Sequence, residues 1–413
     1  MTDFADMCVR ARHAARALAN VSRVEKDDAL ASVADALMRE TDRVAAANAR
    51  DVEEAHARGI KAALLDRLIL DAERTRAVSA SVRAIIAETD PIGEVLEDRA
   101  RPSGLRVRRV RVPLGVIGMI YEARPNVTVE AAALCFKAGN AVILRGGSDA
   151  AHTNQALADV LRAALPERFR DAVQLVVGSS HADVLEMIQA TGAIDLVIPR
   201  GGAALIRFVT ENARVPVVQH YKGVCHLYVD ASANVEEATR IAVNAKLSRP
   251  GVCNALECLL VDRADAQHLL PPMASALLDG GCELRGCEET VALVPRAKRA
   301  TAADYGCEFL DRIIAVRIVG GLDGALDHIA RYGSGHTEAI CTSSEAQAER
   351  FRREVDAACV IVNASTRFHD GGELGLGAEI GIATSRLHWR GPMGALSLTT
   401  MKWLVDGDGQ VRT

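Results

Sequence analysis

A cysteine in a loop is the first residue whose surroundings could support chemistry. Cys253 lies in the segment Arg249–Asn254, where Pro250 and Gly251 end a predicted helix shortly before a predicted strand. Backbone N–H groups at such a junction are free to point at the thiol, and a cysteine thiolate is a strong nucleophile. A packed structural cysteine explains the same pattern equally well, so this loop alone does not decide between the two interpretations.

Three further segments each follow a predicted strand and open a predicted helix. In Arg124–Val127, the amide of Asn126 either turns into the cleft at the end of the strand or caps the helix. The other two segments are Arg145–Ser148 and Pro199–Gly202. In each of them, glycines would let the backbone approach a phosphate, and an arginine could pair with that phosphate. Neither segment is a G-x-G-x-x-G fingerprint or a P-loop, and each could be only a tight turn. These candidate nucleotide-binding residues are Arg145, Gly146, Gly147, Ser148, Arg200, Gly201 and Gly202.

The loop Asn363–Gly372 is rich in hydrogen-bonding side chains and directly follows a predicted strand. Ser365, Thr366 and Arg367 suit recognition of a small anionic substrate, and Arg367 is the natural partner of a carboxylate. The alternative is a capped loop that binds nothing. We favour the binding role because so many polar groups beside a core strand need partners.

The elements that must position these residues follow two patterns. Residues 4 to about 89 show helical spacing of apolar residues, whereas short apolar runs alternate with helical segments from Leu114 onward and again from Cys225. Such alternation is typical of βαβ units and of a parallel sheet covered on both faces. Asn234 and Glu237 predict a helix cap in the second series. We expect strands near 114–121, 141–145, 173–177, 194–198, 225–229, 256–261, 313–319, 338–341 and 357–362.

An alternation of apolar residues and arginine marks the segment Leu105–Val112. Period two with one extra residue, the doubled Arg108–Arg109, predicts an amphipathic strand with a bulge. We interpret it as the edge of a surface hairpin rather than as a nucleic-acid patch; pairing with another subunit is the alternative.

Composition narrows the class of protein. The chain has 413 residues, 49% of them hydrophobic, and a net charge of −5, which predicts two domains and gives no reason to expect nucleic acid or an anionic membrane as a partner. No secretory signal and no run of eighteen apolar residues is present, so we expect a cytoplasmic protein. The ten cysteines form no C-x-x-C pair of the kind found in zinc ribbons, so we expect no metal site. In a reducing cytoplasm we also expect no disulfides.

Taken together, these segments are similar to the γ-glutamyl phosphate reductases, also called glutamate-5-semialdehyde dehydrogenases, of the aldehyde dehydrogenase superfamily. The matching segments occur in the expected order between residues 113 and 403. They are Tyr121–Asn126, Val142–Ser148, Asn244–Lys246, Cys253–Asn254, Val362–Phe368, Gly375–Glu379, Arg390–Gly394 and Thr399–Trp403.

The resemblance implies an α/β fold of aldehyde dehydrogenase type, with two doubly wound domains and a small β oligomerisation element. Residues 1–98 and 113–220 would form the cofactor-binding domain, and residues 221–370 would form the catalytic domain. Residues 99–112 and 385–413 would form the oligomerisation element of a homo-oligomer.

The resemblance also implies roles for individual residues. Cys253 would be the nucleophile, and Asn126 would hold the oxyanion together with the backbone N–H of Cys253. NADPH would lie along Arg145–Ser148 and Arg200–Gly202, with Glu308 on the nicotinamide ribose. Ser365, Thr366 and Arg367 would hold the amino-acid end of the substrate.

One departure from the superfamily sharpens the expected reaction. Hydrolytic members carry a glutamate that activates water, but the corresponding stretch Val217–Gly223 contains no carboxylate. His220 could substitute as a base, although a lone histidine is more often structural. We therefore expect NADPH-dependent reduction of L-glutamyl 5-phosphate to glutamate 5-semialdehyde, a step of proline biosynthesis.

Two alternatives remain at this stage. The first is another acyl-phosphate reductase or an aldehyde dehydrogenase of the same superfamily, and the second is a non-catalytic nucleotide-binding protein on the same scaffold. We expect no kinase domain fused to this chain, so a separate glutamate 5-kinase that makes the unstable acyl phosphate is the expected functional partner.

Overall fold

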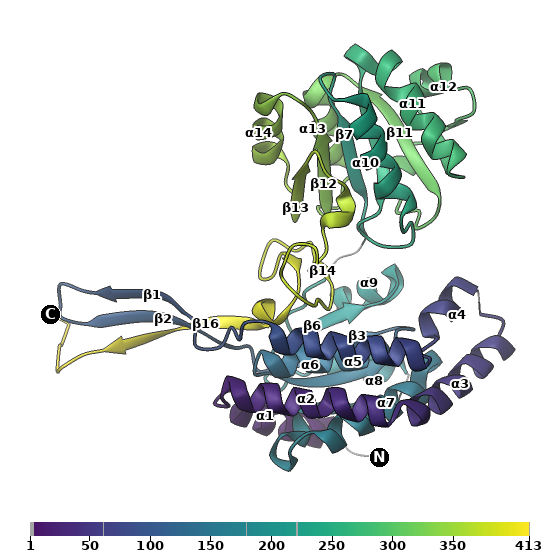
Figure 1. Ribbon diagram of the computed structural model, residues 1–413. Helices are drawn as coiled ribbons and strands as arrows, with labels where there is room; N and C mark the ends of the chain where they lie inside the picture. The colour runs from purple at the N-terminus through teal and green to yellow at the C-terminus, as the bar shows by residue number, and fades with distance from the viewer. Residues whose placement is uncertain (1–3, 61, 179, 220–221, 413) are drawn as a thin grey trace. The chain divides into compact units, whose positions relative to one another are not determined.

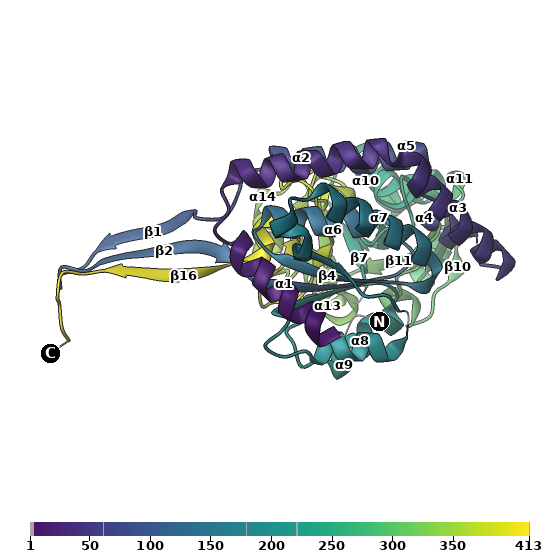
Figure 2. The same ribbon diagram turned by 90° about the horizontal axis from the view of Figure 1, so that it is seen from below.

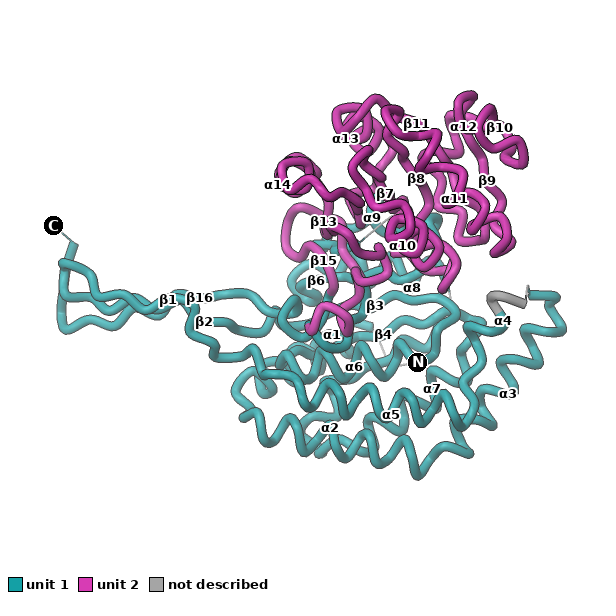
Figure 3. Tube along the Cα trace, turned by 45° about the horizontal axis from the view of Figure 1, so that its top comes forward, with its two compact units in different colours: residues 1–219, 376–381, 393–413 teal, residues 220–375, 382–392 magenta. Residues whose placement is uncertain are grey.

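The computed structural model describes residues 4–60, 62–178, 180–219 and 222–412. It divides into two compact units, shown in different colours in Figure 3. Unit 1 comprises Met1–Gln219, Leu376–Gly381 and Met393–Thr413, and unit 2 comprises His220–Gly375 and Ile382–Pro392. The domain boundary expected between residues 220 and 221 falls outside the described residues.

Unit 1 begins with five helices, as the helical spacing predicts. Ser22 caps the second of them, accepting a hydrogen bond from the Glu25 backbone N–H at 3.3 Å, and the Glu25 carboxylate accepts in return from Ser22 N. Leu30, Val33 and Leu37 form its buried stripe. The helices are α1 (Phe4–Leu18), α2 (Arg23–Arg39), α3 (Thr41–Ala57), α4 (Ala62–Leu68) and α5 (Ala72–Ala87).

A parallel sheet of order β5-β4-β3-β6 follows, and it is covered on both faces. Helices α6 and α7 pack together on one face, and α8 and α9 lie with α1 on the other (Figure 2). This arrangement confirms the βαβ pattern expected from Leu114 onward. The elements are β3 (Val116–Tyr121), α6 (Asn126–Lys137), β4 (Ala141–Gly146), α7 (Ala151–Ala164), β5 (Val173–Leu175), α8 (His181–Gln189), β6 (Leu196–Arg200) and α9 (Ala203–Asn212).

A three-stranded antiparallel arm of order β1-β2-β16 projects from the rest of unit 1 (Figure 1). Its strands are β1 (Val95–Ala100), β2 (Arg106–Pro113) and β16 (Thr399–Asp406). The register between β2 and β16 is unbroken, and the irregularity lies in β1 between Val95 and Glu97. The bulge expected at the doubled arginine is therefore wrong, because the extra residue belongs to the facing strand. The edge position is also wrong, since β2 is the central strand.

Unit 2 holds a seven-stranded parallel sheet of order β10-β9-β11-β8-β7-β12-β13. The Asn234 side chain accepts from Glu237 N at 3.0 Å, which confirms the predicted cap of α10. The short elements β9, α12 and β10 were not expected. The strands are β7 (Cys225–Val229), β8 (Leu256–Asp262), β9 (Glu283–Gly286), β10 (Lys298–Arg299), β11 (Ile313–Val319), β12 (Thr337–Cys341) and β13 (Cys359–Val362). The helices are α10 (Val235–Leu247), α11 (Ala266–Asp279), α12 (Glu288–Leu293), α13 (Gly321–Tyr332) and α14 (Glu345–Glu354), and a small ribbon pairs β14 (Ile382–Ala383) with β15 (Gly391–Pro392).

Each face of this sheet has its own hydrophobic core. Leu259 points into a core built with α10 and α11, and its neighbour Leu260 points into a second core built with α13 and α14. The sheet is thus held rigidly from both sides, and its strand ends are fixed supports for loops. In the described part of the chain, no helix combines the length and the apolar character that crossing a membrane requires.

Candidate active site

The structure brings the three predicted turns of unit 1 to one edge of the sheet. Tyr121, at the end of β3, lies in register with Gly146 of β4 and Arg200 of β6. The chain leaves β3 toward α6 on one face and leaves β6 toward α9 on the other. Such a switch between adjacent parallel strands opens the crevice in which α/β sheets bind ligands.

Asn126 is the first residue of α6, and it does not cap the helix. The cap position is Pro125, and no side chain caps this terminus, so the capping interpretation is wrong. Instead, Asn126 Nδ2 donates to Glu130 Oε2 at 2.9 Å, one turn further along. Ala123 has a φ of 40° just before the helix, in the left-handed region that side chains disfavour. An amide carries two N–H donors, so one remains for a ligand.

The turn after β4 is shaped by close packing. A Cβ on Gly146 would lie 2.0 Å from Asn154 Nδ2, so only glycine fits there. Arg145 is 7% exposed and donates to the Ser180 carbonyl at 3.1 Å, and burial lowers the pKa of its guanidinium. The residues of this turn that a ligand can reach are Gly147, which is half-buried, and Ser148, which is exposed.

A carboxylate that sequence reasoning missed occupies the turn after β6. Glu122 Oε2 accepts from the Gly202 N–H at 2.8 Å, at the N-terminus of α9. A Cβ on Gly201 would lie 2.4 Å from the same oxygen, so glycine is needed to admit the carboxylate. In phosphate-binding folds this is the place of the phosphate, because helix N-termini attract anions. Glu122 therefore competes with a phosphate for this N–H.

In unit 2, Cys253 lies in the turn between α10 and β8 and is half-buried. The turn packs on Gly223: a Cβ there would lie 1.9 Å from the Cys253 carbonyl oxygen. The same carbonyl accepts from Cys225 Sγ at 3.2 Å. The backbone of the thiol-bearing residue is therefore fixed on two sides.

Asn254 ties this turn to the predicted substrate loop. Its carbonyl accepts from Thr366 Oγ1 at 2.7 Å, and its side-chain amide donates to the His369 carbonyl at 2.9 Å and to the Arg367 carbonyl at 3.4 Å. Asn254 is buried, so these bonds are shielded from water. The structure thus brings the Arg367 loop and Cys253 together, although more than 100 residues separate them in sequence.

The three predicted substrate-binding residues lie differently within that loop. Ser365 is buried and its hydroxyl accepts from Arg367 N at 3.3 Å, while Thr366 is buried against Asn254. The Arg367 guanidinium is half-buried and has neither a carboxylate partner nor a hydrogen bond among the described residues. Of the three, Arg367 is therefore the side chain open to an anion.

Carboxylates also lie beside the cysteine turn. Glu308 Oε1 accepts from Gly223 N at 2.9 Å, and burial raises the pKa of Glu308. Glu257 forms a buried ion pair with Lys246 at 2.7 Å, and burial raises the pKa of Glu257 to about 7. His220, named above as a substitute base, lies outside the described residues.

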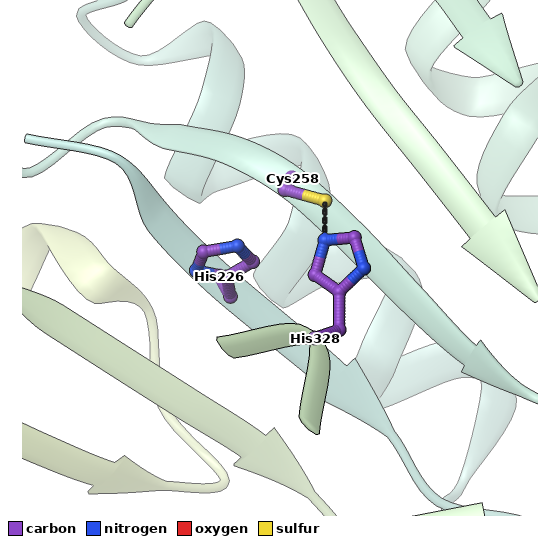
Figure 4. Close-up of side chains that lie close together, drawn as sticks. All are labelled: His226, Cys258 and His328. Carbon is purple, nitrogen blue, oxygen red and sulfur yellow. Dashed lines mark hydrogen bonds between the residues drawn. The ribbon is translucent and has the colours of Figure 1, made fainter. Parts of the chain in front are cut away.

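A buried cluster of His226, Cys258 and His328 has ligand atoms within 4.8 Å of one another, close enough to hold a metal ion (Figure 4). Arg317 Nη1 lies 3.1 Å from His328 Nδ1, and because arginine only donates, Nδ1 must accept. His328 Nε2 then carries the proton and donates to Cys258 Sγ at 3.5 Å. A metal needs a bare nitrogen, so in this arrangement His328 is a core residue rather than a ligand.

Comparisons with known proteins identify the family that shares this fold. The model of the Aldehyde dehydrogenase family matches residues 1–279, more than half of the chain. A γ-glutamyl phosphate reductase of Sorangium cellulosum is 57% identical, covering 98% of this chain and 97% of the relative. One of Anaeromyxobacter sp. (strain K) is 55% identical, covering 97% and 95%. The crystal structure of γ-glutamyl phosphate reductase from Thermotoga maritima superposes with a TM-score of 0.97 at 45% identity, covering 99% of both chains.

The chain thus belongs to the aldehyde dehydrogenase family, and within it to the γ-glutamyl phosphate reductases.

Proposed function

We propose that this enzyme reduces L-glutamyl 5-phosphate to L-glutamate 5-semialdehyde and phosphate through a thioester on Cys253. The observation that supports this best is the link through Asn254, which holds the Cys253 turn beside the loop that carries Arg367. A nucleophile beside an unpartnered guanidinium suits a substrate with a reactive acyl group at one end and a carboxylate at the other. The family to which the chain belongs is consistent with this assignment.

The first chemical step is acyl transfer. The Cys253 thiolate attacks the γ-carbonyl carbon, the carbon–sulfur bond forms, and the bond to the phosphate oxygen breaks. Phosphate departs with the electron pair, so no proton has to be delivered to it. Arg367 holds the α-carboxylate during this step, and the rigid turn on Gly223 keeps the sulfur in place.

The oxyanion that develops on the carbonyl needs donors. We assign this role to the second N–H of the Asn126 amide and to the backbone N–H of Cys253, because Glu130 already fixes the first N–H of that amide. Losing one such donor typically costs 10²–10³ in rate.

A bound nicotinamide cofactor supplies the hydride that reduces the thioester. The residues at the unit 1 edge fit it in part: Gly147 and Ser148 offer an open turn, and the buried Nε of Arg200 has no partner among the described residues. Glu122 occupies the N–H at α9, so a phosphate there has to displace it. We propose NADPH as the cofactor, with Arg145 and Arg200 supplying positive charge near the nucleotide phosphates. Glu308 would accept from the ribose hydroxyls.

The hydrolytic alternative makes a different demand on the site. Glu308 and Glu257 are carboxylates near the turn, but the first is bound to Gly223 N and the second is paired with Lys246. With both carboxylates engaged, we propose that phosphate rather than water attacks the thioester in the oxidative direction. The stimulation of semialdehyde oxidation by added phosphate distinguishes the two.

The nucleophile is tested by Cys253→Ala. We expect the variant to lose at least 10³-fold in phosphate-dependent NADP⁺ reduction with the semialdehyde, because no thioester can form. Cofactor binding, measured by nicotinamide fluorescence, should remain. The matched control, Cys287→Ala, removes a half-buried thiol from the start of α12 and should stay active. Substantial turnover by Cys253→Ala refutes the assignment.

The remaining proposals concern the setting of the enzyme. We propose a homo-oligomer assembled through the β1-β2-β16 arm, and a cytoplasmic location, where the ten free cysteines stay reduced. Because an acyl phosphate hydrolyses in water, an ATP-dependent glutamate 5-kinase must supply the substrate, and it is the expected functional partner. No nucleic acid or membrane enters this scheme.

A further inference from the structure

A polar cavity that belongs to none of the sites described so far lies within unit 2. Its volume is about 250 Å³, and three arginines line it together with a histidine and a tyrosine. These residues are Arg263, Arg317, Arg331, His328 and Tyr332, and Asp327 is the acidic residue of the lining. None of them has a role in the reaction described above.

The cavity lies where the topology of the sheet changes direction. Strands β8 and β11 are adjacent and parallel, and the chain leaves β8 toward α11 on one face and β11 toward α13 on the other. Arg263 directly follows β8, and Gly320 directly follows β11. A Cβ on Gly320 would lie 3.3 Å from Arg263 Nη1, which shows how closely the two strand ends approach. Crevices of this kind at the carboxyl ends of parallel strands are where open α/β sheets bind ligands.

The three guanidinium groups are held in place, and two of them, Arg317 and Arg331, are not neutralised by a carboxylate among the described residues. Arg317 stacks its guanidinium over Tyr305 at 5.4 Å and donates to His328. Arg263 binds Glu289 through Nε and Nη2, both at 2.9 Å, which leaves Nη1 toward the cavity. Helix α13 also starts beside the cavity, and no side chain caps it. Guanidinium forks and a helix N-terminus both favour an anion.

This cavity is separate from the candidate active site. Cys253 precedes β8, whereas Arg263 follows it, so the seven residues of the strand lie between them. At about 3.3 Å per residue, the two positions are roughly 20 Å apart. An anion in the cavity therefore cannot be the acyl phosphate under attack by the thiolate.

We propose that the cavity formed by Arg263, Arg317 and Arg331 binds a small phosphate-bearing anion. Its compact volume suits inorganic phosphate or a phosphate group on a small metabolite, and it is too small for a dinucleotide. Free phosphate and a metabolite phosphate share the same recognition chemistry, so the first is the probe for the site.

The test is calorimetric titration of inorganic phosphate into the full chain at constant ionic strength, with chloride as the balancing ion. Arg367→Ala is the background, because it removes the other unpartnered arginine discussed above. In that background we expect saturable binding, at least tenfold weakened by Arg331→Ala. We expect a similar loss with Arg317→Lys, which keeps the charge but removes the fork. The control Arg296→Ala removes an exposed arginine paired with Asp279 and should leave the affinity unchanged.

Sulfate should compete with phosphate for the cavity. Line broadening of the 31P signal of phosphate should rank the variants by affinity in the same order as calorimetry does. No saturable phosphate binding in the Arg367→Ala background overturns the proposal. Equal phosphate affinity in the Arg331→Ala and Arg296→Ala proteins, each with an unchanged thermal midpoint, overturns it as well. Loss of binding in Arg331→Ala with a normal thermal midpoint supports it.

Discussion

At the residue scale, the candidate site depends on side chains that hold other side chains. Asn126 is aimed by Glu130, the Cys253 backbone is seated on Gly223, and the substrate loop is tied down by Asn254. A reacting group that is pre-positioned needs no reorganisation in the transition state, which is where most of the rate enhancement arises. The supporting residues should therefore affect turnover although they touch no substrate.

Glu130 offers a direct test of such support. We expect Glu130→Ala to lower kcat by about tenfold, because the Asn126 amide loses its anchor and samples other rotamers. The KM for the cofactor should stay unchanged. Glu130→Gln retains an acceptor oxygen for Asn126 and should recover most of the loss. Steady-state kinetics of both variants checks this, and equal kcat values for Ala and Gln would contradict the positioning role.

Glu122 should act on cofactor affinity instead. Its carboxylate takes the Gly202 N–H at 2.8 Å and places a negative charge where a nucleotide phosphate would lie. We expect Glu122→Gln to lower the KM for NADPH several-fold with little change in kcat. Glu211→Gln, which removes an exposed carboxylate from the other end of α9, serves as the control. A higher KM in Glu122→Gln would show that the carboxylate helps to bind the cofactor.

At the scale of elements, much of the architecture is predictable from the sequence. The strands β3, β4, β7 and β8 are buried along their whole length and mostly apolar, so their identity as parallel strands follows from composition. The four-residue strand β9 and the two-residue strand β10 carry charged residues and have no such signal. The bulge was misplaced because an irregular repeat in one strand does not reveal which of the two paired strands holds the extra residue.

The candidate site was predictable in a different way. Cys253 and Arg367 stand out because they lie in loops beside strands, and the structure brings them into one region. Glu122 and Asn254 were missed because their partners lie 80 and more than 110 residues away. The contact between Glu130 and Asn126 was predictable. Glu130 lies four residues after Asn126 in a predicted helix, and residues four apart on a helix share a face.

The packing of the Cys253 turn on Gly223 can be tested by adding a single methyl group at Gly223. Gly223→Ala would place a Cβ 1.9 Å from the Cys253 carbonyl oxygen, so the turn must shift. We expect kcat to fall by at least 10², because a displacement of about 1 Å is enough to misalign a nucleophile. Gly306→Ala, whose Cβ would meet only ordinary contacts beginning at 3.7 Å, is the control and should keep its activity. Similar kcat values for the two variants would show that the turn tolerates movement.

Two buried histidines of unit 2, His369 and His328, predict a loss of stability as the pH falls. Burial lowers the pKa of His369 to about 4, while an unfolded histidine titrates near 6.5. The unfolded state therefore binds the proton first as the pH falls, and stability is lost between about pH 6.5 and 4. We expect the wild type to lose about 2 kcal/mol from this group between pH 7 and 5. Denaturant unfolding of unit 2 at the two pH values checks this.

A smaller pH-dependent loss is expected for His369→Gln. His268→Gln removes a histidine whose side chain is 66% exposed, and it should keep the wild-type slope. His328, whose pKa burial lowers to about 3, acts in the same direction and remains in both variants. Identical slopes for His369→Gln and the wild type would mean that His369 is protonated in the folded protein.

At the scale of the whole molecule, the arm is the surface that most clearly calls for a partner. Strand β16 is paired with β2 on one side, and it exposes Met401, Trp403 and Val405 at 47%, 57% and 56%. Exposed apolar side chains beside an open strand edge promote aggregation of a monomer, but they stabilise an interface when a partner covers them. In the homo-oligomer that we propose, β16 is therefore the expected contact between copies of the chain.

Trp403→Asp tests that contact. A charge in place of the largest apolar side chain of the arm should shift the molar mass measured by light scattering toward smaller species. Val411→Asp alters a residue that is 85% exposed and lies beyond the strand, so it should leave the mass unchanged. An unaltered assembly in Trp403→Asp would move the interface to another surface.

The arm also constrains when this protein can become complete during its synthesis. Arg108 and Asp406, which form an ion pair across β2 and β16, are 298 residues apart in the chain. A ribosome releases the β1–β2 hairpin long before β16 exists, and at about 5–20 residues per second the delay lasts from roughly 15 s to a minute. Throughout that interval the β1–β2 hairpin has an unpaired edge on β2, and this edge is available to chaperones or to the arm of a neighbouring nascent chain. The β16 contact that we propose between copies of the chain can thus form only after nearly all of this sequence has been translated.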